Sequence, residues 1–287
     1  MNMSSTASVP ILVTADWLLA HHASVKLFDA TSHLPTLGRN ANQEYSERRI
    51  AGAGRFDIDK IADKSSTLPH TLPDAAFFEQ QMQHLGVNND DHVVVYCDSI
   101  FLSAARAWWM LRLFGHDRVS VLNGGLKAWV AIDGPLETGA PAVAEAAGNF
   151  TVRPSAGAQM IPMASLRQMV ENNVAGQIAD ARSPGRFAGV DPEPRAGLRG
   201  GHIPGSSNVP IASLIADDGG LRPVDEISAA FEAGGIDVSR PVITSCGSGV
   251  TACGLALGLA LLGNEQVFVY DGSWSEWGAS DAPIDTD

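Results

Sequence analysis

The feature of this sequence that most constrains its fold is an internal repeat. Residues 113–129, LFGHDRVSVLNGGLKAW, align without a gap with residues 261–277, LLGNEQVFVYDGSWSEW. Self-similarity over so long a distance indicates a duplicated structural unit. Three pairs of identical residues keep the same separation of 148 positions: Gly115 and Gly263, Val119 and Val267, and Trp129 and Trp277. The sequence therefore predicts two domains of similar fold in tandem.

The length and a change of composition place the boundary between these domains. A chain of 287 residues is long enough for two domains of ordinary size. The segment around residues 136–149 is rich in Pro, Gly and Ala and shows no hydrophobic period, as is typical of a linker. We therefore expect a first domain over residues 1–135, a linker over residues 136–149 and a second domain over residues 150–287.

Short apolar runs alternate with helical patterns in both halves. HVVVY (92–96) and PVITS (241–245) have the length and the branched residues of buried strands. Each is followed by an apolar helical pattern, at residues 103–115 and 250–263. Strands that alternate with helices predict a parallel sheet with helices on both faces. The fold class is therefore α/β, with one such sheet in each domain.

Composition excludes several classes of partner. The formal net charge of −13 argues against nucleic-acid binding, which usually needs a basic surface. The longest helix-like apolar run, residues 254–263, is too short to span a bilayer, so no membrane association is expected. The first residues lack the basic start of a signal peptide. An odd count of three cysteines fits a reducing compartment, so a cytoplasmic location is expected.

Motifs for metals and nucleotides are missing from the sequence. It contains no CxxC or HxxxH pair that would suggest metal ligands. It also lacks the P-loop pattern and the GxGxxG fingerprint of dinucleotide-binding proteins. We therefore expect neither a metal nor an organic cofactor.

Cys246 is the strongest candidate for a catalytic residue. It lies between the strand at 241–245 and the helix that begins near residue 250. A cysteine nucleophile acts as the thiolate, whereas an ordinary thiol has a pKa of about 8.5. Unpaired backbone N–H groups at the start of a helix can stabilise such an anion, and Gly247 and Gly249 allow the backbone to curl around it.

The other two cysteines are expected to be structural. At the separation of 148 positions, the residue that matches Cys246 is Asp98, so Cys97 lies one position out of register. Cys253 lies inside the apolar helical pattern. Free cysteines in such places are most often small core residues.

Several motifs resemble those of the rhodanese superfamily, and in particular of the 3-mercaptopyruvate sulfurtransferases. CGSGVT (246–251) is similar to their active-site loop, and GGHIPGSSNVP (200–210) is similar to a signature of their second domain. SAARAWWMLRLFGH (103–116) and NGGLKAW (123–129) are similar to first-domain motifs. The resemblance covers nearly the whole chain and implies two rhodanese-like domains with a catalytic cysteine only in the second. RIAG (49–52) departs from the family's HIPG pattern, from which we expect a structural effect only.

The resemblance implies a two-step transfer of sulfur. The Cys246 thiolate takes the sulfur of 3-mercaptopyruvate as a persulfide, pyruvate leaves, and a thiol such as thioredoxin, or cyanide, then collects the sulfur. Arg186 and Arg195 would bind the carboxylate and ketone of the donor, since a guanidinium suits such a pair of oxygens. The residues that surround the sulfur would be those of the loop, Gly247, Ser248, Gly249, Val250 and Thr251.

The resemblance also implies a proton relay. The segment FDIDKIADKSSTLPHTLP (56–73) is similar to a family segment that supplies an aspartate and a histidine. Carried over to this chain, the relay consists of Asp63, His70 and Ser248. Histidine titrates near neutrality, and a carboxylate can orient it.

Four other functions fit the sequence less well. A cysteine phosphatase needs an arginine six positions after the cysteine, where this chain has Ala252. A thiosulfate sulfurtransferase usually carries a basic pair after the cysteine, where this chain has neutral Gly247 and Ser248. A non-catalytic rhodanese-like module would normally have lost the cysteine. A redox pair with Cys253 would need a closer spacing in the sequence.

Overall fold

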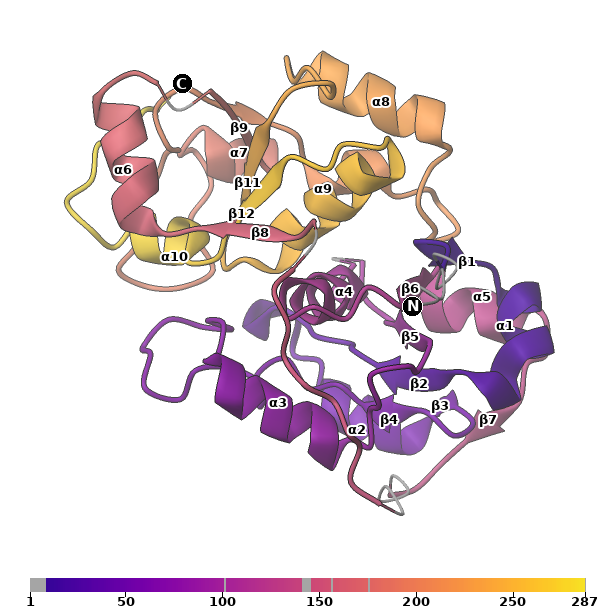
Figure 1. The fold of residues 1–287 in the computed structure, drawn as a ribbon. Coiled ribbons are helices and arrows are strands. Elements are labelled where there is room, and N and C mark those ends of the chain that lie inside the picture. Colours follow the sequence, from indigo (N-terminus) through magenta and orange to yellow (C-terminus); the bar gives the residue numbers. More distant parts are fainter. Residues whose placement is uncertain (1–8, 101, 141–145, 156, 175, 287) are drawn as a thin grey trace, which may run out of the picture.

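The computed structural model describes residues 9–100, 102–140, 146–155, 157–174 and 176–286. Its two halves form separate lobes, the first coloured indigo to magenta and the second rose through orange to yellow in Figure 1. In these described residues, each lobe contains a five-stranded sheet whose neighbouring strands are all parallel. The predicted α/β fold with one parallel sheet in each domain is confirmed.

The two sheets have the same topology. The first has the order β1-β6-β5-β2-β4 and the second the order β8-β12-β11-β9-β10, read from the corresponding edge. The strands of the first sheet are β1 (Leu12–Val13), β2 (Lys26–Asp29), β4 (Gly54–Arg55), β5 (Val93–Tyr96) and β6 (Val119–Leu122). Those of the second are β8 (Gln159–Ile161), β9 (Gln177–Asp180), β10 (Ser206–Asn208), β11 (Val242–Ser245) and β12 (Val267–Tyr270). The shared order supports the duplication that the repeat predicts.

Helices cover both faces of each sheet. In the first domain, Val93 and Val95 of β5 face the core shared with α3 (Ala75–His84) and α4 (Ala104–Leu113), whereas Val94 and Tyr96 face α1 (Ala15–His21) and α5 (Gly125–Ala131). Because successive strand side chains point to opposite faces, a sheet covered on both sides needs the continuous apolar strands that the sequence shows. In the second domain, α8 (Val224–Ala233) and α9 (Val250–Leu261) cover one face, and α6 (Met163–Glu171) and α10 (Ser273–Trp277) cover the other. Two shorter helices, α2 (Ala41–Glu47) and α7 (Pro184–Phe187), follow β2 and β9.

The two domains share one apolar core. Helices α4 and α9 pack against each other at the boundary between the lobes (Figure 1). Buried residues of both helices belong to a single cluster of apolar contacts, which also includes residues of both sheets. A continuous core of this kind holds the domains in one arrangement, because separating them would expose apolar surface to water.

The segment between the domains runs along the first domain. β7 (Leu136–Glu137) pairs antiparallel with β3 (Arg49–Ile50), and the amides of Gly148 and Phe150 donate to carbonyls of the first domain. Part of the predicted linker, residues 136–149, is therefore hydrogen-bonded to the first domain. The domain boundaries themselves stay a prediction.

The strand register corrects the expected relation between Cys97 and Cys246. Tyr96 is the partner of Asp29 between β5 and β2, and Ser245 is the partner of Asp180 between β11 and β9. The residue after Tyr96 is Cys97, and the residue after Ser245 is Cys246. The two cysteines therefore occupy the same place in the two domains. Cys97 and Cys246 are 149 positions apart, one more than the 148 positions that separate the matched residues of β6 and β12.

Candidate active site

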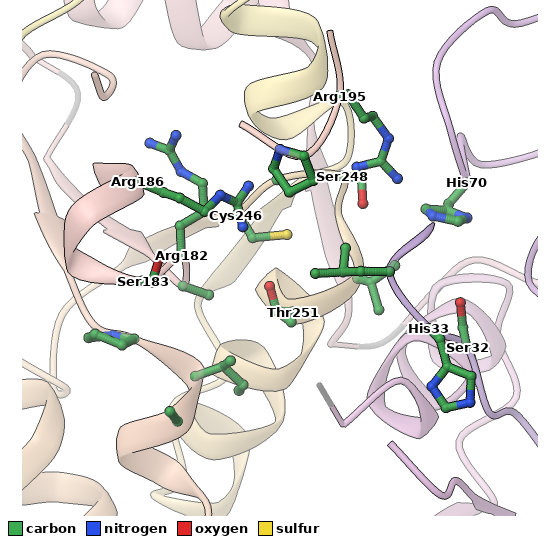
Figure 2. Close-up of a pocket in the computed structure, with 18 of the residues that line it drawn as sticks. Ser32, His33, His70, Arg182, Ser183, Arg186, Arg195, Cys246, Ser248 and Thr251 are labelled. Atoms are coloured by element: carbon green, nitrogen blue, oxygen red, sulfur yellow. The ribbon is translucent and has the colours of Figure 1, made fainter. Parts of the chain in front are cut away.

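Cys246 lies at the carboxyl end of the central strand of the second sheet. It directly follows β11, and α9 begins four residues later at Val250, with Gly249 as the preceding N-cap in the left-handed region at φ 78°. Ligands of parallel α/β sheets bind at this edge. Cys246 is 2% exposed, and its sulfur lines the cavity drawn in Figure 2.

The first two residues of the loop 246–249 direct their carbonyls toward α10. Cys246 O accepts from Trp274 N at 2.9 Å, and Gly247 O accepts from the N and Oγ of Ser275 at 2.9 and 2.6 Å. Within the described parts of the chain, the N–H groups of Gly247, Ser248 and Gly249 donate to no other group. With their carbonyls turned outward, these amides can stabilise negative charge on the cysteine sulfur.

The cavity beside Cys246 lies between the two domains. Its volume is about 310 Å³, enough for a small organic acid. The second domain contributes Arg182, Arg186, Arg195, Cys246, Gly247, Ser248, Val250 and Thr251, and the first contributes Ser32, His33, Leu34 and His70. In Figure 2, Cys246 and Thr251 lie on one side and His70, His33 and Ser32 on the other. A molecule bound here would contact both domains.

Arg186 is held against the catalytic loop. Its Nη2 and Nε donate to Glu193 Oε2 at 2.6 and 3.3 Å, and the Glu193 side chain is only 3% exposed. Nη2 lies 2.8 Å from the place that a Cβ on Gly247 would occupy. The carboxylate fixes the guanidinium beside the loop while leaving its other amino group toward the cavity.

Arg195 has no comparable partner. Among the described residues, its guanidinium makes no hydrogen bond or ion pair, and it lines the cavity. Burial lowers the pKa of Arg195, and the neighbouring positive charge of Arg186 lowers it further. A half-buried cation without a counter-ion favours an anionic ligand, because the ligand would supply the missing charge.

The other two arginines of this region support the structure. Arg182 pairs with Asp180 Oδ2 at 2.9 Å and Glu193 Oε1 at 2.7 Å, and it stacks on the Trp274 ring. Arg199 donates to the carbonyls of α10 and the segment after it, at Trp277, Gly278 and Ala282. Their donors are thus committed to the protein, whereas the assignment of the substrate to Arg186 and Arg195 stays a prediction.

His70 faces the cavity, but Asp63 does not orient it. His70 Nδ1 lies 2.7 Å from Asp59 Oδ1, and this contact lowers the pKa of Asp59. Asp63 instead accepts from the N and Oγ of Ser65 at 2.8 and 2.7 Å, within its own turn. The structure therefore replaces Asp63 by Asp59 as the carboxylate partner of His70. Both hydrogen bonds that Asp63 Oδ1 accepts come from Ser65, within the turn at residues 63–65.

The remaining predicted loop residues occupy two kinds of position. Ser248, Val250 and Thr251 line the cavity with Gly247. Gly249 lies behind them, where a Cβ would stand 2.5 Å from Asp271 O. Among the described residues no hydrogen bond joins Ser248 to His70, so the predicted relay is not closed here.

Several residues of the site carry no signal in the sequence. Glu193 lies in a loop after α7 and resembles any exposed acidic residue, although its side chain is buried between two arginines. Ser273 Oγ accepts from Cys246 N at 3.1 Å and lies 3.9 Å from Cys246 Sγ. Ser32 and His33 come from the first domain. Only the packing of the two domains brings Ser32 and His33 to the cavity beside the thiol.

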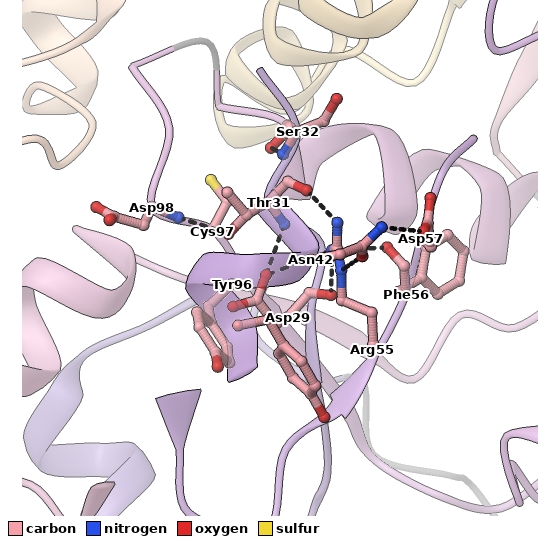
Figure 3. A network of polar contacts seen from close by, with 12 residues as sticks. Asp29, Thr31, Ser32, Asn42, Arg55, Phe56, Asp57, Tyr96, Cys97 and Asp98 are labelled. Atoms are coloured by element: carbon pink, nitrogen blue, oxygen red, sulfur yellow. Dashed lines mark hydrogen bonds and ion pairs between the residues drawn. The ribbon is translucent and has the colours of Figure 1, made fainter. Parts of the chain in front are cut away.

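At the corresponding place in the first domain, the first amide of the loop is already paired. Figure 3 shows that Asp98 N, the counterpart of Gly247 N, donates to Thr31 Oγ1, and the two atoms are 2.9 Å apart. Arg55 binds the neighbouring carbonyls of Asp29 and Thr31. Burial raises the pKa of the Cys97 thiol, although nearby backbone amides hydrogen-bond to the sulfur and oppose this shift. Cys97 thus matches Cys246 in position, but burial dominates its environment.

Comparisons with known proteins agree with this geometry. The model of the rhodanese-like domain matches residues 14–132 and 163–280. The 3-mercaptopyruvate sulfurtransferase of Escherichia coli K12 is 44% identical over 95% of this chain and 97% of its own length. The human 3-mercaptopyruvate sulfurtransferase is 41% identical over 96% and 94%. The rat thiosulfate sulfurtransferase is 40% identical over 88% and 85%.

Solved structures show the same likeness. The crystal structure of SseA from Escherichia coli, described as a 3-mercaptopyruvate sulfotransferase with the rhodanese fold, superposes with a TM-score of 0.82 at 39% identity. It covers 93% of this chain and 99% of its own. The chain therefore belongs to the two-domain sulfurtransferases of the rhodanese superfamily.

No group of three or more His, Cys, Asp or Glu side chains in the described part of the chain could hold a metal ion. No helix in it is both long and apolar enough to cross a bilayer.

Proposed function

We propose that this protein transfers the sulfur of 3-mercaptopyruvate to a thiol acceptor through a persulfide on Cys246. One observation carries the proposal: a thiol lines a small cavity, and neither the loop amides beside it nor the Arg195 guanidinium in the cavity has a partner among the described residues. The most similar relatives include several 3-mercaptopyruvate sulfurtransferases.

The donor would bind through its charged end. 3-Mercaptopyruvate carries a carboxylate beside a ketone, and Arg195 offers a planar set of donors without a protein partner. Arg186, fixed by Glu193, adds a second positive group on the loop side of the cavity. This binding mode leaves the sulfur of the donor free to approach Cys246.

The first half of the reaction cleaves a carbon–sulfur bond. The Cys246 thiolate attacks the sulfur of the donor and forms an S–S bond. The C–S electron pair leaves with the carbon as the enolate of pyruvate, which then takes a proton at that carbon. The enzyme retains a persulfide, whose negative charge the same loop amides can stabilise.

His70 would transfer the proton of the donor thiol. The proton that the donor thiol loses must reach the carbon of the enolate, and a histidine in the cavity can carry it. With Nδ1 beside Asp59, the His70 Nε2 atom is the nitrogen left for exchange. Ser248 lines the same cavity and would link the sulfur to the ring once a substrate is bound.

The second half of the reaction delivers the sulfur. An acceptor thiolate attacks the outer sulfur of the persulfide, forms a new S–S bond and releases the Cys246 thiolate. Thioredoxin or a small thiol would fit this role, and the predicted reducing cytoplasm would keep either of them reduced. Both the acceptor and the location stay predictions.

Thiosulfate is the alternative donor. The rat thiosulfate sulfurtransferase shares 40% of its residues with the matched part of this chain. Gly247 and Ser248 give the loop no positive side chain for a dianion. We therefore expect activity on thiosulfate to be weaker, and a higher kcat/KM with thiosulfate than with 3-mercaptopyruvate would reverse the choice of donor.

The central step can be tested by mass. After incubation with 3-mercaptopyruvate without acceptor, the peptide that contains Cys246 should gain one sulfur atom, and one pyruvate should appear for each sulfur gained. A Cys246→Ser variant should show neither change, whereas Cys97→Ser should behave as the wild type. Undiminished pyruvate release by Cys246→Ser would reject catalysis by this thiol.

A further inference from the structure

A fully buried ion pair crosses the domain boundary behind the active site. Arg106, on α4 of the first domain, is 0% exposed, and its Nη1 lies 2.6 Å from Asp271 Oδ1. Asp271 follows β12 in the second domain and is also buried. Neither residue lines the active-site cavity.

Both members of the pair also hold the chain at residues 70–72, here called the His70 strap. Arg106 Nη2 donates to His70 O at 2.5 Å, and Asp271 Oδ2 accepts from Leu72 N at 2.8 Å. The strap is therefore fastened at each end by a different partner of the same ion pair. His70 itself has φ 58°, a left-handed conformation that a non-glycine residue adopts only when its surroundings impose it.

The same pair reaches the catalytic loop from behind. Arg106 Nη1 donates to Gly249 O at 3.4 Å, and Cys253 Sγ donates to the same carbonyl at 3.1 Å. Asp271 O and Arg106 Nη1 also close off the space beside Gly249, at 2.5 and 3.1 Å from its would-be Cβ. The carbonyl of Gly249 is thus held away from the cavity.

Stability alone does not account for such a pair. Burying two charges costs several kcal/mol for each ion, and apolar residues of similar size often serve a core equally well. Here Arg106 Nη2 and Asp271 Oδ2 hydrogen-bond to the strap, and Arg106 Nη1 also donates to the loop. Those two segments carry His70 and Cys246.

We propose that Arg106 and Asp271 are positioning residues that set His70 of the first domain against the Cys246 loop of the second. The pair bridges the two domains, so it couples their packing to the placement of the reacting groups. This inference rests on the proposed function of His70 and Cys246, and it extends the catalytic machinery to two residues that touch no substrate.

A double variant tests the proposal without leaving one buried charge unpaired. Arg106→Met with Asp271→Leu replaces the pair by apolar side chains, so the fold should survive. The matched control is Arg112→Met with Asp117→Leu, which removes the other arginine–aspartate contact of α4, at 3.9 Å and partly exposed. If the double variant unfolds, Arg106→Lys replaces it in the test. Lysine keeps a positive charge beside Asp271 but cannot donate to the carbonyls of both His70 and Gly249.

Two measurements separate positioning from stability. Amide hydrogen exchange should accelerate in the peptide that contains the strap in the double variant and not in the control. The kcat for pyruvate release should fall about 100-fold, the lower limit for a positioned acid–base group, while KM changes less than about three-fold because Arg186 and Arg195 are untouched. The pH profile of kcat should also lose the limb that depends on His70.

The outcomes are distinct. Unchanged exchange in the strap, or faster exchange with wild-type kcat and pH profile, overturns the proposal. If the wild type forms no persulfide and releases no pyruvate, the proposed function fails instead. The exchange experiment then still decides whether the pair fixes the strap.

Discussion

The guanidinium of Arg186 occupies the space that a side chain on residue 247 would need. Nη2 lies 2.8 Å from the would-be Cβ of Gly247, and Glu193 holds this nitrogen at 2.6 Å on the other side. Gly247 does not lie among the residues with positive φ. The glycine is thus required by the close approach of the arginine and not by the backbone conformation.

Gly247→Ala should therefore impair binding of the donor without disturbing the fold. The added methyl group would push Arg186 away from the loop and weaken one charge-assisted contact, which is worth about 1.5–3 kcal/mol. We expect KM for 3-mercaptopyruvate to rise about ten-fold or more, as steady-state kinetics would show. Gly220→Ala, at another glycine without positive φ and far from the cavity, is the control, and equal kinetics for both variants would contradict the packing argument.

Arg195→Met should have a larger effect, because Arg195 has no partner in the described protein that could compete for its donors. Removing a buried cation that binds a carboxylate should lower kcat/KM for 3-mercaptopyruvate about 100-fold. Arg195→Lys should recover only part of the loss, since an ammonium cannot form two parallel hydrogen bonds. The exposed Arg240→Met is the control. Equal losses for Arg195→Met and Arg240→Met would show that only net charge matters.

The fold could be predicted almost entirely from the sequence. The repeat, the apolar strands and the following helical patterns depend on local composition, so β11 and α9 were expected where they lie. The relation of Cys97 to Cys246 was not predicted correctly. An ungapped separation taken from the later repeat cannot reveal a one-residue difference between β5 and the end of α4, whereas strand pairing does.

The site could be predicted only in part. Cys246, Arg186 and Arg195 are marked by their loop motifs and share one cavity. The partner of His70 depends on how the chain turns between residues 59 and 70, and Asp57, Asp59 and Asp63 are equivalent as letters in that segment. Arg106 and Asp271 are more than 160 positions apart, and only the packing of α4 on α9 brings them together.

Variants of Asp59 and Asp63 provide a matched test of which carboxylate orients His70. Asp59→Asn should lower kcat about ten-fold or more, because His70 would lose the carboxylate that orients it. Asp63→Asn should leave kcat unchanged, since the Asp63 carboxylate accepts from Ser65 and does not pair with His70. A loss of activity confined to Asp63→Asn would restore the relay expected from the sequence.

The three cysteines should differ sharply in reactivity toward an alkylating reagent at pH 8. Burial raises the pKa of Cys253 to about 12 and also raises that of Cys97, so both remain protonated and therefore unreactive at this pH. Cys246 lines the cavity between the domains and lies beside amides that have no partner in the described part of the chain. Peptide mapping of the native protein should find label on Cys246 only, and prior incubation with pyruvate, which carries the carboxylate and ketone of the donor, should slow the labelling. In denaturant all three should react. Native labelling of Cys97 or Cys253 at a rate comparable to that of Cys246 would show that the loop confers no special reactivity on its thiol.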